Sequence, residues 1–153
     1  MTRAVKGSHD MMAEAARFAA TLHPRPEATI VALSGDLGAG KTTFVKGVAK
    51  ALGIGEHVTS PTFVIMKIYD LDSPPAGGFK RLIHIDAYRL KGIQHLKVLG
   101  WEDLIKDPGN LILIEWPEKI DGAIPANAVR LTFRHGTEDT REIDYNSRHV
   151  GAV

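Results

Sequence analysis

The chain has 153 residues and no cysteine, and its 19 Lys and Arg residues nearly balance 18 Asp and Glu residues, giving a formal net charge of +1 at pH 7. This balance provides no general electrostatic attraction to nucleic acid or to a membrane surface. The lack of cysteine excludes disulfide bonds, thiolate metal sites and cysteine nucleophiles. No apolar stretch is long enough to span a bilayer and no signal-peptide core is present, so we expect a cytoplasmic protein in which residues 1–153 form one domain.

Hydrophobic periodicity predicts secondary structure from the N-terminus onward. Apolar residues recur at helical spacing over residues 11–22, with Ser8 or Asp10 as the candidate N-cap, and Pro24 ends the helix because proline cannot continue it. Residues 29–33 form a short apolar run rich in β-branched side chains, which is typical of a buried strand. The same patterns predict, in chain order, a helix over 41–52, strands over 63–69 and 82–86, one or two short helices within 92–106, a strand over 111–115, and an antiparallel pair of strands over 128–133 and 141–145.

The most specific local motif is the run GDLGAGKT at residues 35–42, which matches the phosphate-binding pattern G-x-x-x-x-G-K-[ST] in full. Its glycines permit backbone angles that turn successive N–H groups toward phosphate oxygens. Lys41 can reach the β- and γ-phosphates of a nucleotide, and the Thr42 hydroxyl can ligate Mg²⁺. The sequence therefore predicts a nucleoside-triphosphate site with Mg²⁺. The residues assigned to nucleotide binding are Gly35, Asp36, Leu37, Gly38, Ala39, Gly40, Lys41, Thr42 and Thr43.

The order of the predicted elements indicates the fold class. Strands that alternate with helices are typical of a layered α/β fold. A phosphate-binding loop between the first predicted strand and the next helix narrows that class. We therefore predict a P-loop NTPase-like three-layer α/β fold, with a mostly parallel central sheet, helices on both faces and antiparallel closing strands.

Asp86 and Glu115 each end a predicted buried strand. The carboxyl ends of parallel strands form the edge where ligands bind in open α/β sheets. One carboxylate would bind Mg²⁺ while the other orients the attacking water, and the spacing leaves open which does which; alternatively, both acids simply leave the core at a strand end. On a strand, His84 faces the same way as Asp86, and we assign it no catalytic role. Trp116, on the opposite face from Glu115, is expected to serve packing.

A third segment, Thr59, Ser60, Pro61 and Thr62, places three hydroxyl groups between the helix after the phosphate loop and the next strand. Switch proteins with a phosphate loop place hydroxyl groups that sense the γ-phosphate in such a segment. An ordinary turn fixed by Pro61 accounts for the same residues equally well.

Four segments taken together resemble the bacterial TsaE family, formerly called YjeE. They are GDLGAGKTTF at 35–44, TSPTF at 59–63, HIDAYRL at 84–90 and IEWPE at 114–118. Their order and spacing extend along nearly the whole chain. The combination is far more specific than the phosphate loop alone, which many ATPases and GTPases share.

The resemblance implies a small ATPase that is needed for the threonylcarbamoyl modification of the adenosine beside the anticodon in tRNAs. Such a protein binds Mg-ATP and a TsaB–TsaD pair, and it uses hydrolysis to reset that pair without transferring the threonylcarbamoyl group itself. Contact with tRNA is then indirect, through the complex, and neither DNA nor a membrane is an implied partner.

The resemblance also implies roles for individual residues. Phosphate contacts fall on residues 38–43, Mg²⁺ ligands on Thr42 and Glu115, and an essential aspartate at the metal side on Asp86. Residues 59–62 correspond to the switch segment. The implied catalytic residues are Lys41, Asp86 and Glu115, and the implied contacts to nucleotide or partner are Arg89, Trp116 and Arg141.

Three alternative functions also use a phosphate loop: a small-molecule kinase, a GTP switch, and a nucleotide-gated binding module with negligible turnover. Small-molecule kinases usually add an arginine-rich lid and an acceptor pocket, and neither stands out in 153 residues. A GTP switch would carry an Asn/Thr-Lys-x-Asp element, which the sequence lacks. A binding module would differ from the ATPase only in rate.

Overall fold

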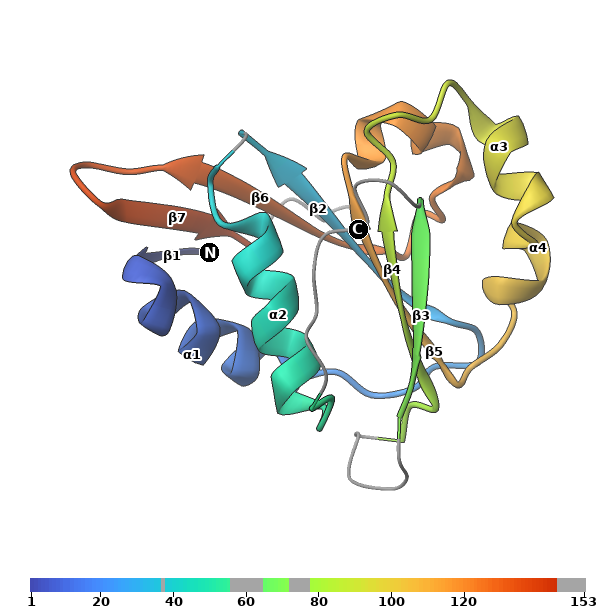
Figure 1. Cartoon of the computed structure of the whole chain (residues 1–153), viewed down its shortest axis with the longest axis horizontal. Coiled ribbons are helices and arrows are strands. Elements are labelled where there is room, and N and C mark those ends of the chain that lie inside the picture. The colour runs from blue at the N-terminus through green and yellow to red at the C-terminus, as the bar shows by residue number, and fades with distance from the viewer. Residues whose placement is uncertain (37, 56–64, 72–77, 146–153) are drawn as a thin grey trace.

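The structure, a computed structural model, describes residues 1–36, 38–55, 65–71 and 78–145. Seven strands form one sheet in the order β1-β7-β6-β2-β5-β4-β3 (Figure 1). The elements in chain order are β1 (Thr2–Lys6), α1 (Gly7–Ala19), β2 (Thr29–Gly35), α2 (Lys41–Ala51), β3 (Met66–Asp70), β4 (Arg81–Asp86), α3 (Ile93–Val98), α4 (Trp101–Leu104), β5 (Asn110–Glu115), the 3₁₀ segment η1 (Pro117–Ala123), β6 (Val129–His135) and β7 (Thr140–Asp144).

The four central strands of the sheet, β6, β2, β5 and β4, run parallel to one another. Antiparallel strands complete both sides, with β3 beside β4 and with β7 and then β1 beyond β6. The α/β class and the antiparallel closing pair β6–β7 are confirmed. The centre of the sheet is parallel as predicted, and the sheet as a whole is mixed, because three of its six pairings are antiparallel. The short connection between β6 and β7, residues 136–139, holds no helix, and such connections join antiparallel neighbours.

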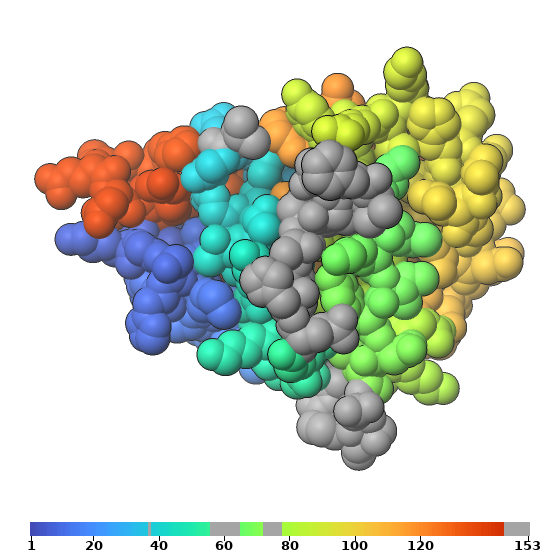
Figure 2. Space-filling view, in the orientation of Figure 1, coloured from blue at the N-terminus to red at the C-terminus, as the bar shows by residue number. Residues whose placement is uncertain are grey.

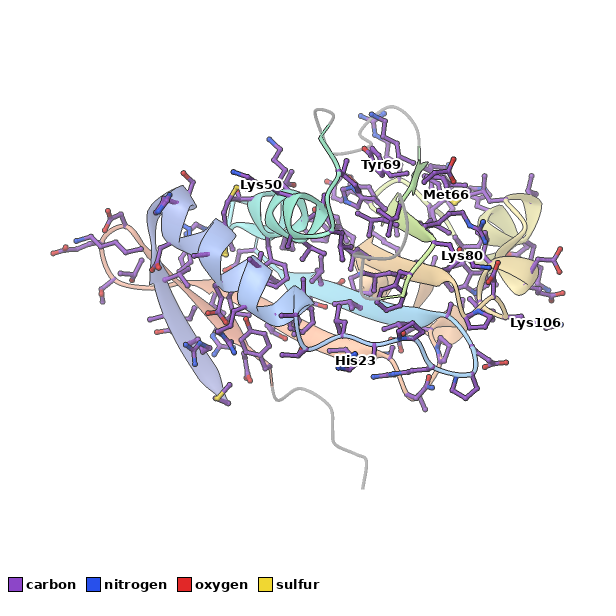
Figure 3. All side chains as sticks on the ribbon, turned by 90° about the horizontal axis from the view of Figure 1, so that it is seen from below. His23, Lys50, Met66, Tyr69, Lys80 and Lys106 are labelled. Carbon is purple, nitrogen blue, oxygen red and sulfur yellow. The ribbon has the colours of Figure 1, made fainter. Side chains whose placement is uncertain are left out.

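Helices cover both faces of the sheet, and alternating side chains of the strands contact each set. Val31 and Leu33 of β2 belong to one buried cluster with side chains of α1 and α2, while Ile30 and Ala32 belong to a second cluster with side chains of α3, α4 and η1. Figure 2 shows α1 and α2 side by side, and Figure 3 labels Lys50 on α2 and Met66 and Tyr69 on β3. The period of two along β2 thus divides the core into two layers.

The N-terminal region differs from its prediction. No strand was expected before the first helix, yet β1 pairs with β7, and only Val5 of β1 is buried. The helix α1 begins at Gly7, so Ser8 lies inside it and is not its N-cap; Asp10 also lies inside α1, where its carboxylate accepts a hydrogen bond of 2.8 Å from the Lys6 N–H. The helix ends at Ala19, before the prolines are reached.

Other boundaries are close to the predicted ones. The predicted strand over 63–69 is observed as β3, although residues 63 and 64 lie outside the described part of the chain. Two short helices, α3 and α4, occupy the 92–106 segment as expected. Within the described ranges, no helix combines the length and the apolar character needed to cross a membrane.

Candidate functional site

The loop that carries the phosphate-binding motif connects the end of β2 to the start of α2. Gly40 immediately precedes the helix in the left-handed region, with φ of 101°, where a side chain would be strained. Gly35 ends β2 where a Cβ atom would lie only 2.1 Å from the carbonyl oxygen of Phe133 on β6. Glycine is therefore required for the turn at one position and for close packing between β2 and β6 at the other. Leu37 lies outside the described residues.

Lys41 is the first residue of α2, and its side chain turns back over the loop. Its Nζ donates a hydrogen bond of 2.7 Å to the Gly35 carbonyl and lies 3.8 Å from the centre of the Trp116 ring. The residue is 4% exposed. Burial lowers the pKa of the Lys41 ammonium, although the carboxylates of Glu115, Glu118, Asp86 and Asp36 partly oppose that shift. The site therefore holds a cation away from water in a surrounding field of negative charge.

The two strand-end acids meet at one edge of the sheet, as predicted. Asp86 and Glu115 are paired in register on the parallel strands β4 and β5. Glu115 is 3% exposed, and its Oε1 accepts a hydrogen bond of 3.4 Å from the Thr42 hydroxyl. Asp86 is half-buried, and its Oδ1 accepts a hydrogen bond of 3.0 Å from the N–H of Tyr88. The hydroxyl predicted to ligate Mg²⁺ is therefore joined to Glu115.

His84 makes a contact that the sequence pattern did not assign. Its Nε2 lies 2.7 Å from Oε2 of Glu115, and the ring is fully buried. The alternation along β4 gave a signal, because His84 faces the same way as Asp86. The contact itself depends on the register between β4 and β5, which the sequence does not show.

Trp116 does not continue β5, so its predicted position on the opposite face is wrong. Its backbone lies in the left-handed region, with φ of 58° and ψ of 51°, and Pro117 then starts η1. This turn brings the half-buried indole over Lys41 and next to the Tyr88 ring, with 5.1 Å between the two ring centres. Tyr88, for which the sequence pattern predicts no role, therefore belongs to the same cluster.

The remaining predicted residues divide into four groups. Arg141 on β7 reaches the loop, where its Nε donates a hydrogen bond of 3.3 Å to the Gly38 carbonyl. Arg89 lies on the exposed turn after β4. Ala39 is fully buried, while Asp36 is exposed and Thr43 is intermediate. The predicted switch residues Thr59, Ser60, Pro61 and Thr62 lie outside the described residues.

Comparison with known proteins identifies the family. The family model described as "Threonylcarbamoyl adenosine biosynthesis protein TsaE" matches residues 5–143. The chain belongs to the TsaE family. The resemblance carried by the four sequence segments is thus confirmed.

Relatives of the TsaE family from distant bacteria are similar over most of their length. Proteins named "tRNA threonylcarbamoyladenosine biosynthesis protein TsaE" from Treponema pallidum and Streptomyces coelicolor are each 37% identical to this chain; the matches cover 76% and 79% of this chain and 81% and 76% of the relatives. The crystal structure of Bacillus subtilis YdiB superposes with a TM-score of 0.73 at 31% sequence identity, over 94% of this chain and 82% of that one.

Proposed function

We propose that this TsaE-family protein binds Mg-ATP at the loop between β2 and α2, hydrolyses it, and thereby resets a TsaB–TsaD-like pair during threonylcarbamoyladenosine formation on tRNA. One observation carries the proposal. The buried ammonium of Lys41, the Thr42 hydroxyl and the carboxylates of Asp86 and Glu115 converge at one edge of the sheet. A P-loop NTPase site requires this set of groups.

The loop and Lys41 fit a polyphosphate. The eleven-residue helix α2 begins at Lys41, so the N–H groups of its first turn and the positive end of its dipole lie at the loop. The ammonium has three donors, and the Gly35 carbonyl occupies one of them. A phosphate would give this cation a charged partner in place of the neutral ones it has now, which supports binding of a triphosphate.

Thr42 and Glu115 fit Mg²⁺. Both offer oxygen atoms, which this cation prefers, and it is commonly held by one or two carboxylates together with nucleotide phosphates and water. When bound, Mg²⁺ would neutralise charge on the phosphates and favour departure of the leaving group. Because the Thr42 hydroxyl is bonded to Glu115, we assign Glu115 to the metal and Asp86 to orienting the attacking water.

The partner assignment rests on the family and on charge. TsaE-family relatives are named for threonylcarbamoyladenosine biosynthesis on tRNA. A net charge of +1 supplies little attraction to tRNA, so we propose that the partner proteins hold the tRNA.

An ATPase assay of the protein alone and with a TsaB–TsaD pair tests the proposal. We expect slow hydrolysis by the protein alone and faster hydrolysis with the pair, because phosphate-loop switches often gain a completed site from a partner. Lys41→Ala is the control for contaminating ATPases and should be inactive in both assays. Equal rates with and without the pair, and no complex on gel filtration, would contradict the proposal.

A further inference from the structure

The buried pair of His84 and Glu115 lies directly behind the proposed metal site. His84 on β4 and Glu115 on β5 are diagonal neighbours, since His84 is in register with Leu113 and Glu115 with Asp86. Oε2 of Glu115 contacts the His84 ring at 2.7 Å, while Oε1 accepts the hydrogen bond from Thr42 at 3.4 Å. Each oxygen of this one carboxylate therefore has its own partner.

The position of the ring proton follows from the surroundings of the two nitrogens. His84 is 0% exposed, and its Nδ1 has no hydrogen-bond partner in the described part of the chain. A proton on Nδ1 alone would leave a buried N–H unsatisfied and would set the Nε2 lone pair against a carboxylate oxygen. The neutral ring therefore carries its proton on Nε2, and an imidazolium would donate from the same atom. The hydrogen bond to Glu115 is thus the same in either protonation state.

We propose that His84 is a positioning residue: its Nε2–H fixes one oxygen of Glu115 and so directs the other toward Thr42 and Mg²⁺. This inference rests on the proposed function. The terminal torsion of a glutamate side chain is broad, so a carboxylate without this donor would rotate and leave one oxygen buried and unsatisfied. The ring is well suited to the task because β4 and β5 hold it on the same face as Glu115.

The proposal predicts an effect on Mg²⁺ that is separate from nucleotide binding. Outer partners of metal-binding side chains change metal affinity by about 10- to 100-fold. We expect loss of the Nε2 donor to reduce the gain in nucleotide affinity that Mg²⁺ provides by about tenfold. Nucleotide affinity in EDTA should stay unchanged, because the phosphate loop and Lys41 keep their own donors.

Two substitutions, each of which replaces one of the two ring nitrogens by an amide, provide a matched test. The amide of His84→Gln can reach the position of Nε2, whereas the shorter amide of His84→Asn reaches only that of Nδ1. Calorimetry gives the dissociation constant of a non-hydrolysable ATP analogue for each protein, in EDTA and in Mg²⁺. The ratio of the two constants measures the contribution of Mg²⁺. Urea unfolding establishes that each variant is folded, and His84→Leu replaces His84→Asn if the latter is not.

For His84→Asn we expect the ratio of the dissociation constant in EDTA to that in Mg²⁺ to be about tenfold smaller than for the unmodified protein. For His84→Gln the same ratio should stay within about threefold of the unmodified value. The dissociation constants measured in EDTA should be equal for all three proteins. The positioning role would be overturned if folded His84→Asn kept the ratio of the unmodified protein, or if the ratio fell equally in His84→Asn and His84→Gln. If the unmodified protein bound no analogue in either buffer, the proposed function itself would be wrong. These failures are therefore distinguishable.

Discussion

The substitution Lys41→Met separates the stability of the fold from the affinity for nucleotide, and we expect the two to change in opposite directions. Methionine keeps the length of the apolar stem against Trp116 and removes the charge. The lost hydrogen bond to Gly35 and the lost cation–π contact are together worth about 1 to 3 kcal/mol. Against this loss, the substitution removes the desolvation penalty of a buried charge, which is typically several kcal/mol. The lowered pKa of Lys41 indicates that this desolvation penalty exceeds the favourable contacts of the ammonium. The variant should therefore be at least as stable as the unmodified protein.

Nucleotide affinity should fall in the same variant. An ammonium that pairs with phosphate oxygens contributes about 3 kcal/mol through charge-assisted hydrogen bonds, which corresponds to roughly a hundredfold in the dissociation constant. Urea unfolding measures the first effect, and calorimetric titration with Mg-ATP measures the second. Undiminished affinity for Mg-ATP in Lys41→Met would refute the assignment of the loop, and a loss of several kcal/mol in stability would refute the account of the buried charge.

The lowered pKa of Lys41 also predicts a dependence on pH. In the window between the pKa of the folded protein and the ordinary value of 10.5, the unfolded chain binds more protons at this residue than the folded chain does. The contribution of Lys41 to stability therefore rises as pH increases through that window. The gap in unfolding free energy between Lys41→Met and the unmodified protein should narrow accordingly, and urea unfolding at a series of pH values up to 10.5 measures it. A difference that widens as pH rises would contradict the predicted direction of this pH dependence.

Three further predictions concern other parts of the fold. Gly35→Ala should destabilise the protein by at least about 2 kcal/mol in urea unfolding, because its Cβ would lie 2.1 Å from a carbonyl oxygen of β6; unchanged stability would contradict that packing. Tyr145→Phe should cost about 1 kcal/mol, because the hydroxyl donates to the buried carboxylate of Glu14, and a neutral result would mean that the bond contributes nothing. Nucleotide binding should change the fluorescence of Trp116, which covers the loop, so Trp116→Phe should abolish the change and Trp101→Phe should preserve it; the reverse would place the nucleotide elsewhere.

The parts of the site that could be predicted from the sequence are those fixed by short-range physics. The glycines, Lys41 and Thr42 lie within one short segment of chain, the loop and the start of α2, and the ends of two apolar runs located Asp86 and Glu115. Parallel pairing of β4 and β5 then brought both acids to one edge, as the general rule for open α/β sheets requires.

The parts that the sequence missed depend on long-range pairing or on unusual backbone angles. The strand β1 has one buried residue and exists because β7, more than 130 residues away, provides its partner. The contact between His84 and Glu115 needs the register of β4 with β5. Trp116 faces the loop only because its φ is positive, which strand periodicity does not foresee.

The central claim is that ATP hydrolysis by this protein resets its partners between rounds of tRNA modification. The most direct measurement counts threonylcarbamoyladenosine residues formed per TsaB–TsaD pair, with the activated threonylcarbamoyl donor and tRNA in excess. We expect many rounds with the unmodified protein and ATP, and about one round without it or with Lys41→Ala. Continued turnover in the absence of this protein, or equal turnover with Lys41→Ala, would contradict the account.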